Sequence, residues 1–132
     1  MTKSKLPKNK LPAIKIAAMP KDTNPGGSIF GGWIMSQIDI AAGIVALERA
    51  KGRVVTVAVN SMEFHEPVFV GDVISCYADV IKTGNTSITV KVEVYAERNP
   101  SNIEIVKVTQ AELTFVALDE NRKPRQLPEL DN

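Results

Sequence analysis

The chain has 132 residues, of which 44% are hydrophobic and 23% charged, as in a single ordinary globular domain. Its formal net charge of +1 excludes the strongly basic class of nucleic-acid-binding proteins. One cysteine and one histidine are too few for an intramolecular disulfide or a structural zinc site, so no metal is expected.

No targeting or membrane-spanning segment is predicted. The lysine-rich start of the chain is not followed by the apolar stretch of a signal peptide. No run of about 18 apolar residues is present, so no membrane contact is expected. The expected compartment is therefore the cytoplasm.

The two ends of the chain are predicted to lie outside the folded domain. Residues 1–10 are polar and lysine-rich and are expected to form a flexible arm. The domain is expected over residues 11–125, followed by a polar tail over residues 126–132. Within the domain, residues 12–19 alternate weakly and suggest an edge strand, and residues 20–27 are rich in turn formers.

A single long helix is predicted from Gly31 to about Ala50. This segment lacks proline, and Lys51 and Gly52 supply a C-terminal stop. Because apolar residues occupy nearly every side of the helix, it is expected to be buried on all sides. In a chain this short, other parts of the protein must surround it.

Long strands are predicted after the helix, over residues 54–64, 73–82, 87–97 and 105–118. One face of the third is predicted to hold Ile88, Val90, Val92, Val94 and Ala96. One face of the last is predicted to hold Lys107, Thr109, Ala111, Leu113 and Phe115. The order predicts an α+β protein in which a curved antiparallel β-sheet wraps around one long central helix.

Asp39 is the residue that does not fit its surroundings. It lies in the middle of the apolar helix, where an ionised carboxylate is costly unless it is paired or hydrogen-bonded. It is too far from the start of the helix to act as a cap. Gly32, Ser36 and Gly43 share its face, and such small residues allow close approach of a ligand or of a second helix across a dimer axis. A satisfied structural aspartate is the alternative.

The segment N-P-G-G-S-I-F-G-G leads into this helix. Glycine-rich loops at a helix start present free backbone N–H groups and the positive end of the helix dipole, which suit a phosphate or a developing oxyanion. Asn24 adds a neutral hydrogen-bonding side chain, although an Asn-Pro pair is usually only a turn.

Together these residues resemble the YciA-type acyl-CoA thioesterases of bacteria, relatives of the two-domain brain acyl-CoA hydrolases. The resemblance covers roughly residues 12–125. It is carried by N-P-G-G-S-I-F-G-G-W-I-M-S-Q-I-D at 24–39, F-H-E-P-V-F-V-G-D at 64–72, K-T-G-N-T-S-I-T-V-K-V-E-V at 82–94 and L-D-E-N-R-K-P-R at 118–125. It implies a hot-dog fold, dimers with a continuous sheet, assembly into a trimer of dimers, and active sites at the dimer interface.

The resemblance also assigns roles to individual residues. Asp39 matches the catalytic acid, Asn24 the asparagine that helps to hold substrate or water, and Gly32 the position of the thioester carbonyl. Asn85 stands where the family often has arginine, and His65 is outside the catalytic set. We expect Asn24 of one subunit to serve Asp39 of its neighbour.

Thioester hydrolysis then follows from these groups. Asp39 acts as a base on water or as the nucleophile, with Asn24 and Ser36 as the side chains that hold it ionised. No cofactor is expected, because coenzyme A is part of the substrate and product. Further substrate contacts are predicted at Gly31, Ser36, Lys82, Thr86, Ser87, Arg122, Lys123 and Arg125.

Other functions remain open from the sequence alone. A non-catalytic acyl-CoA-binding module is one alternative. A hydratase of the same fold is another, although such enzymes typically pair a histidine with an acid, and the only histidine lies outside the helix motif. A purely structural oligomer is the third. The strand over residues 87–97 and the small-residue helix face both predict at least a dimer.

Overall fold

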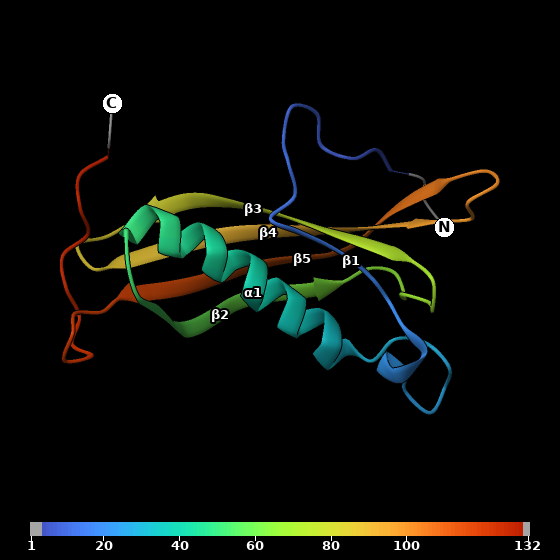
Figure 1. Ribbon diagram of the computed structural model, residues 1–132, viewed down its shortest axis with the longest axis horizontal. Helices are drawn as coiled ribbons and strands as arrows, with labels where there is room; N and C mark the ends of the chain where they lie inside the picture. The colour runs from blue at the N-terminus through green and yellow to red at the C-terminus, as the bar shows by residue number, and fades with distance from the viewer. Residues whose placement is uncertain (1–3, 131–132) are drawn as a thin grey trace.

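The computed structural model describes residues 4–130 and contains one long helix packed against one sheet (Figure 1). The elements in chain order are β1 (Ile14–Ala17), η1 (Pro20–Asp22), α1 (Gly31–Ala50), β2 (Val54–Phe64), β3 (Val73–Thr83), β4 (Ser87–Arg98) and β5 (Glu104–Ala117). Within this part of the chain, no helix is long and apolar enough to cross a bilayer.

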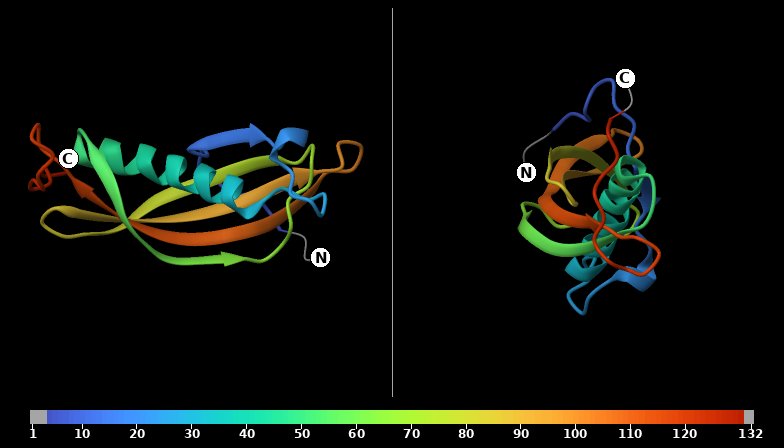
Figure 2. Two further views of the ribbon diagram at one scale, coloured as in Figure 1. Left: turned by 90° about the horizontal axis from the view of Figure 1, so that it is seen from below. Right: turned by 90° about the vertical axis from the view of Figure 1, so that its left-hand side faces the viewer.

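The five strands form a single antiparallel sheet in the order β1-β3-β4-β5-β2. β3, β4 and β5 follow one another as a meander, whereas β2 pairs only with β5 and lies at one edge. Figure 2 shows α1 lying along one face of the curved sheet. The predicted architecture, a curved antiparallel sheet around one long helix, is confirmed.

The core lies between α1 and the alternating residues of β4. Ile88, Val90, Val92, Val94 and Ala96 are all fully buried, as their spacing predicts. The helix packs on them mainly through Ile34, Ile38, Ala41, Ala42 and Ala46. Because three of these residues are alanines, the helix backbone can lie close to the sheet.

The far side of α1 is exposed in the single chain, so the prediction of a helix buried on all sides is wrong for one chain. Met35, Ile40, Ile44 and Leu47 are 37–51% exposed. The sheet covers only one side of the helix. The sequence cannot distinguish a side covered by the chain's own sheet from one that needs a second molecule.

Two strand predictions also need correction. Lys107 does not share a face with Thr109, because the register shifts between Val94 and Tyr95 and places Lys107 opposite Tyr95. Strand 87–97 does not need an external partner, because β4 lies between β3 and β5. The long strand with an open edge is β2, on which Val55, Val57 and Val59 are exposed.

Both described chain ends contact the domain. In the 1–10 arm, of which residues 1–3 lie outside the described part, the Ser4 amide donates to the Ile105 carbonyl at 2.7 Å. Lys10 forms an ion pair of 2.7 Å with Asp79. In the 126–132 tail, described as far as residue 130, the Leu127 amide donates to the Asn85 carbonyl at 2.8 Å. The boundaries of the domain stay a prediction.

The helix ends where the sequence predicts, and Lys51 rather than Gly52 adopts the left-handed conformation. Lys51 has φ of 54° and its amide donates to the Leu47 carbonyl. Gly52 has another role: a Cβ atom there would lie 2.9 Å from Nη2 of Arg125. The absence of a side chain at Gly52 therefore lets the Arg125 guanidinium reach the end of the helix.

Candidate active site

Asp39 lies on the exposed side of α1, and its carboxylate has one described partner. Thr56 on β2 donates a hydrogen bond from Oγ1 to Oδ1 of Asp39 at 2.7 Å. The sequence predicts a desolvated carboxylate held by Ser36 or Asn24. In the single chain, Asp39 is exposed and Ser36 instead donates to the Trp33 carbonyl at 2.7 Å. Thr56 is therefore the residue that sequence reasoning missed.

Asp39 opens onto a groove of about 490 Å³ between α1, β2 and β5. The other lining residues are mainly apolar residues and glycine, together with Thr56 and one further acid, Glu48. They are Ile40, Gly43, Ile44, Leu47, Glu48, Val54, Thr56 and Phe115. At Gly43 a Cβ atom would lie 3.8 Å from the Phe115 ring, an ordinary contact distance. Gly43 thus adds width to the groove rather than relieving a clash.

Asn24 lies in the loop that precedes α1 and bonds within that loop. Its Nδ2 donates to the Ser28 hydroxyl at 3.1 Å, and its backbone amide donates to the Ser28 carbonyl at 2.7 Å. Its Oδ1 atom is buried without a hydrogen-bond partner. No described hydrogen bond joins Asn24 to Asp39 within one chain, so the structure does not bring these two predicted site residues together by itself.

Gly31 and Gly32 begin the helix and are exposed, as a site for a carbonyl oxygen requires. No side chain caps this helix start. The Trp33 amide donates to the Phe30 carbonyl at 3.1 Å, whereas the amides of Gly31 and Gly32 have no described acceptor and are available to an oxyanion. Gly31 also lines a second groove of about 360 Å³ together with Phe64 and His65. His65 itself lies 3.2 Å from Glu63 and is exposed.

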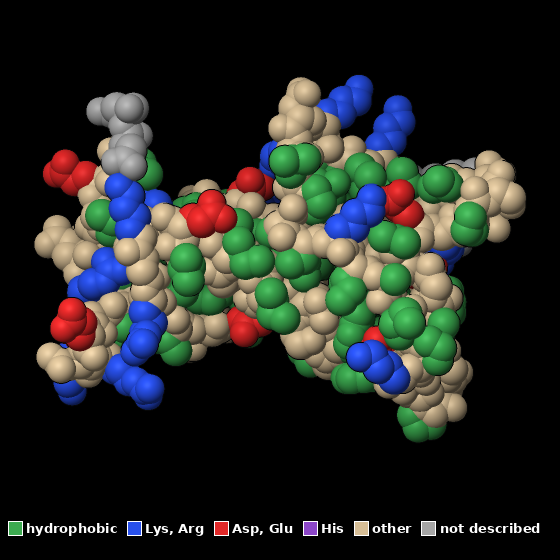
Figure 3. All heavy atoms as spheres, viewed as in Figure 1, with side chains coloured by type: hydrophobic (Ala, Val, Ile, Leu, Met, Phe, Trp, Pro, Cys, Tyr) green, Lys and Arg blue, Asp and Glu red, His purple; other side chains and the backbone are tan. Residues whose placement is uncertain are grey.

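The basic residues predicted to bind coenzyme A gather at the end of the molecule where α1 stops. Lys and Arg side chains crowd this end in Figure 3, on the left. Lys82, Arg122 and Lys123 are exposed. Thr86 and Ser87 are half-buried in and after the β3–β4 turn, which contacts β5 through the bond from the Ala117 amide to the Thr86 carbonyl. These residues belong to the same end of the sheet, where β3 and β5 end and β4 begins.

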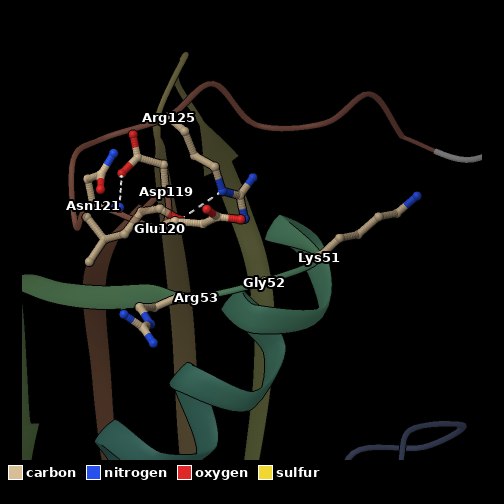
Figure 4. Close-up of a pocket in the computed structure, with 8 residues that line it drawn as sticks. Lys51, Gly52, Arg53, Asp119, Glu120, Asn121 and Arg125 are labelled. Carbon is tan, nitrogen blue, oxygen red and sulfur yellow. Dashed lines mark hydrogen bonds between the residues drawn. The ribbon is translucent and has the colours of Figure 1, made fainter.

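Arg125, which the sequence predicts as a coenzyme A contact, bonds two backbone carbonyls in the structure. Its Nη2 donates to the Ala50 carbonyl at 2.8 Å and its Nε to the Leu118 carbonyl at 3.0 Å. Figure 4 shows its side chain pointing toward the end of α1, beside a cavity of about 610 Å³. The carboxylates of Asp119 and Glu120 also line this cavity. Lys51 and Arg53 line it as well, so side chains of both charges surround the cavity, and the two bonds of Arg125 close the helix end.

Cys76 provides no competing nucleophile. It is fully buried on β3, as its apolar surroundings predict. Burial raises the pKa of its thiol to about 12, which keeps the thiolate scarce at neutral pH. Within residues 4–130, no cluster of three or more His, Cys, Asp or Glu side chains is placed to hold a metal ion.

Comparison with known proteins agrees with this geometry. The thioesterase superfamily model matches residues 26–101. The "Uncharacterized acyl-CoA thioester hydrolase" of Buchnera aphidicola subsp. Baizongia pistaciae is 51% identical over 127 residues, covering 95% of this chain and 93% of that protein. The acyl-CoA thioester hydrolase YciA of Salmonella typhimurium is 50% identical over 117 residues, covering 87% and 88%.

A solved structure gives the same result for the fold. The hexameric thioesterase of Yersinia pestis superposes with a TM-score of 0.86 at 51% identity, covering 94% of this chain and 99% of that one. This chain belongs to the thioesterase superfamily and is a hot-dog enzyme of the YciA-type acyl-CoA thioester hydrolase family.

Proposed function

We propose that this protein hydrolyses acyl-CoA to a free acid and coenzyme A, with Asp39 as its catalytic carboxylate. The observation that carries the proposal is the Asp39 carboxylate, held by Thr56 at 2.7 Å, at the mouth of a largely apolar groove. Such a groove suits an acyl chain, and the carboxylate lies where the thioester would end. Curated relatives with this activity support the substrate class.

The chemistry needs only groups of the chain and water. As a base, Asp39 takes a proton from water while the water oxygen attacks the thioester carbonyl carbon. The amides at Gly31 and Gly32 stabilise the oxyanion, which then collapses with cleavage of the carbon–sulfur bond. The thiolate of coenzyme A leaves and takes up a proton. As a nucleophile, Asp39 would form a mixed anhydride that water then cleaves.

A single-turnover reaction in ¹⁸O-labelled water separates these two routes. A base mechanism places the label in the fatty acid during the first turnover. A nucleophilic mechanism with water attack at Asp39 places it in the Asp39 carboxylate. Before this labelling experiment, thiol release should be assayed with a panel of acyl-CoA substrates of increasing chain length. A wild-type protein that binds acyl-CoA but releases no thiol would leave only the non-catalytic binding module.

The active unit of the proposal is a dimer, assembled further into a hexamer as a trimer of dimers. Its support is the exposed apolar side of α1 beside the open edge of β2, where Val55, Val57 and Val59 are 42–55% exposed. The solved relative from Yersinia pestis is hexameric. A two-fold axis through this face would pair β2 with its copy and cover Asp39.

Within that dimer, Asn24 of one subunit completes the active site that contains Asp39 of the other. Support comes from the single chain, in which the described bonds of Asn24 stay within its own loop. Mixing Asn24→Ala and Asp39→Ala proteins, each expected to keep only a low residual activity, tests this, because a heterodimer would contain one intact site. Activity should return on mixing. Demonstrated subunit exchange without recovered activity would place Asn24 in its own chain's site or outside the reaction.

Lys82, Arg122 and Lys123 are proposed to bind the phosphates of coenzyme A. Their replacement by alanine should raise KM about tenfold, equivalent to about 1.4 kcal/mol, and leave kcat unchanged. Alanine at Lys5, Lys8 and Lys15 removes the same charge elsewhere and is the matched control. An equal rise in KM in both triple variants would show general charge attraction rather than a binding site.

The enzyme is further proposed to need no cofactor and to work in the cytoplasm. No cofactor enters the chemistry above, since water supplies the nucleophile and the thiol leaves unaided. A cytoplasmic location is supported by the unpaired thiol of Cys76, which is ordinary in a reducing compartment. Protein dialysed against a chelator should therefore keep its turnover. Activity that is lost on dialysis and restored by a metal would contradict the proposal that no cofactor is needed.

A further inference from the structure

The segment F-H-E-P-V-F-V-G-D at residues 64–72 has no role in the chemistry proposed above. In the structure it runs from the end of β2 through the loop that leads to β3. Residues 67–72 of this loop lie beside the segment that contains Asn24. They are also contacted by Arg98, a half-buried arginine at the end of β4, so the position of the loop can affect the active site.

Arg98 holds both ends of this loop. Its Nη2 lies 2.9 Å from Oδ2 of Asp72 and donates to the Pro67 carbonyl at 3.1 Å. The side chains of Arg98 and Asp72 are only 13% and 4% exposed, so the ion pair is poorly screened by water. The guanidinium carbon also lies 5.0 Å from the centre of the Phe69 ring.

Asp72 in turn fixes the shape of the loop. Its Oδ2 accepts a hydrogen bond from the Phe69 amide at 2.9 Å, and its own amide donates to the Phe69 carbonyl at 3.0 Å. Gly71 completes the turn with φ of +91°, a conformation that favours glycine. The loop is thus a compact turn whose two ends are joined through one guanidinium.

The 67–72 loop forms hydrogen bonds with both ends of residues 18–29, the segment that contains Asn24. The Ala18 amide donates to the Asp72 carbonyl, and the Gly71 amide donates to the Ala18 carbonyl, both at 2.9 Å. At the other end, the Ile29 amide donates to the Val68 carbonyl at 2.8 Å. Ile29 also bridges to Thr23, the residue before Asn24. A shift of the loop would therefore move the turn that presents Asn24.

We propose that Arg98 is a positioning residue that sets Asn24 for thioester hydrolysis by holding the 67–72 loop. This rests on the proposed function of Asn24. A lysine at position 98 keeps the charge, but its ammonium group lacks the planar guanidinium that lies over the Phe69 ring while one nitrogen bonds both ends of the loop. Arg98→Lys should therefore loosen the loop while retaining a buried ion pair.

The matched control is Glu93→Gln, on the same strand. Glu93 forms an ion pair of 2.7 Å with Lys107, and the side chains are 23% and 29% exposed. This pair lies away from the 67–72 loop, so its loss should change neither kcat nor the exchange of the Asn24 segment. Arg98→Lys should lower kcat about tenfold or more, a typical scale for misplacing a catalytic contact, with KM within about twofold of wild type.

Two measurements separate positioning from general destabilisation. In the Asn24→Ala background, Arg98→Lys should change kcat by less than about twofold, because residues that act through one another are non-additive. Backbone hydrogen exchange of residues 18–30 should be faster in Arg98→Lys, while that of residues 87–96 stays at the wild-type rate. If Arg98→Lys does not fold, Asp72→Asn replaces it, since the amide retains the shape and the bond to Phe69.

Equal losses of kcat in the wild-type and Asn24→Ala backgrounds would overturn the proposal, as would unchanged exchange over residues 18–30. The exchange measurement does not depend on activity. A wild-type protein without thioesterase activity would therefore contradict the proposed function and still leave the loop contact of Arg98 to be judged by exchange.

Discussion

The two sides of helix α1 have similar residues and different surroundings. The inner side packs Ile34 and Ile38 on the sheet, where they are at most 3% exposed. The outer side carries Ile40 and Leu47, each 51% exposed, beside Asp39. The inner side is complete in one chain and should determine stability. The outer side is incomplete in one chain, and activity and assembly are therefore expected to depend on it.

The largest expected effect is on the outer side. Asp39→Asn should lower kcat by about 10² to 10⁴, the range for a positioned base, which corresponds to about 3–5 kcal/mol. Because Asp39 is not part of the apolar core between α1 and the sheet, thermal unfolding should shift little. Turnover and calorimetry on the same sample check both parts. A folded variant with wild-type kcat would end the assignment of Asp39.

The inner side should show the opposite pattern. Ile38 is fully buried, so Ile38→Ala should cost about 2–5 kcal/mol of unfolding free energy through the cavity it leaves. The kcat of the folded fraction should stay within about twofold of wild type, since the side chain points away from Asp39. Denaturant titration and active-site-normalised turnover measure the two quantities. A large loss of kcat in Ile38→Ala without a loss of stability would show that the inner side of α1 does not act mainly on stability.

Thr56 tests how the outer side is organised. Thr56→Val removes the donor to Asp39 with little change of shape or strand propensity. Hydrogen bonds to charged groups contribute about 1.5–3 kcal/mol, so kcat should fall about ten- to a hundredfold. Thr56→Ser retains the hydroxyl and should recover most of that loss. If both variants lose the same activity, the threonine acts through its methyl group and the hydrogen bond is unimportant.

The smallest effect is expected on the face of the sheet that points away from the helix. Tyr95 lies there, where burial and then the neighbouring Glu93 raise the pKa of its phenol to about 12. The unfolded phenol titrates near pH 10, so the folded state holds its proton more tightly. The contribution of Tyr95 to the stability of the folded state is complete below pH 10 and is lost as the pH rises through 12. Tyr95→Phe should flatten the alkaline fall in stability and leave kcat at pH 7 unchanged.

The fold was largely predictable because its signals are local. The glycines before Trp33 and the stop at Lys51 bound the helix, and strict alternation marks β4. The position of Lys107 was not predictable, since the irregularity beside it exists only in the pairing of β4 with β5. The exposed side of α1 was missed because Ile40 and Ile38 are the same residue type, and composition does not say which will meet the sheet.

The candidate site was predictable where a residue contradicts its own surroundings, and not where it depends on a contact. Asp39 is conspicuous in an apolar helix. Thr56 is one threonine in a valine-rich strand, and only the packing of β2 beside α1 reveals its bond. The charge of Arg125 suggests a phosphate, whereas its partners are two carbonyl oxygens that no sequence pattern indicates.

The strand order has a consequence for synthesis on the ribosome. β2 is made directly after the helix, yet among the described strands it pairs only with β5, the last one. Until β5 emerges, β2 has no strand to pair with, and its exposed valines are available for wrong contacts. Pulse-labelled exchange during refolding should protect β3 and β4 before β2. Simultaneous protection of all strands would mean that β2 does not wait for its partner.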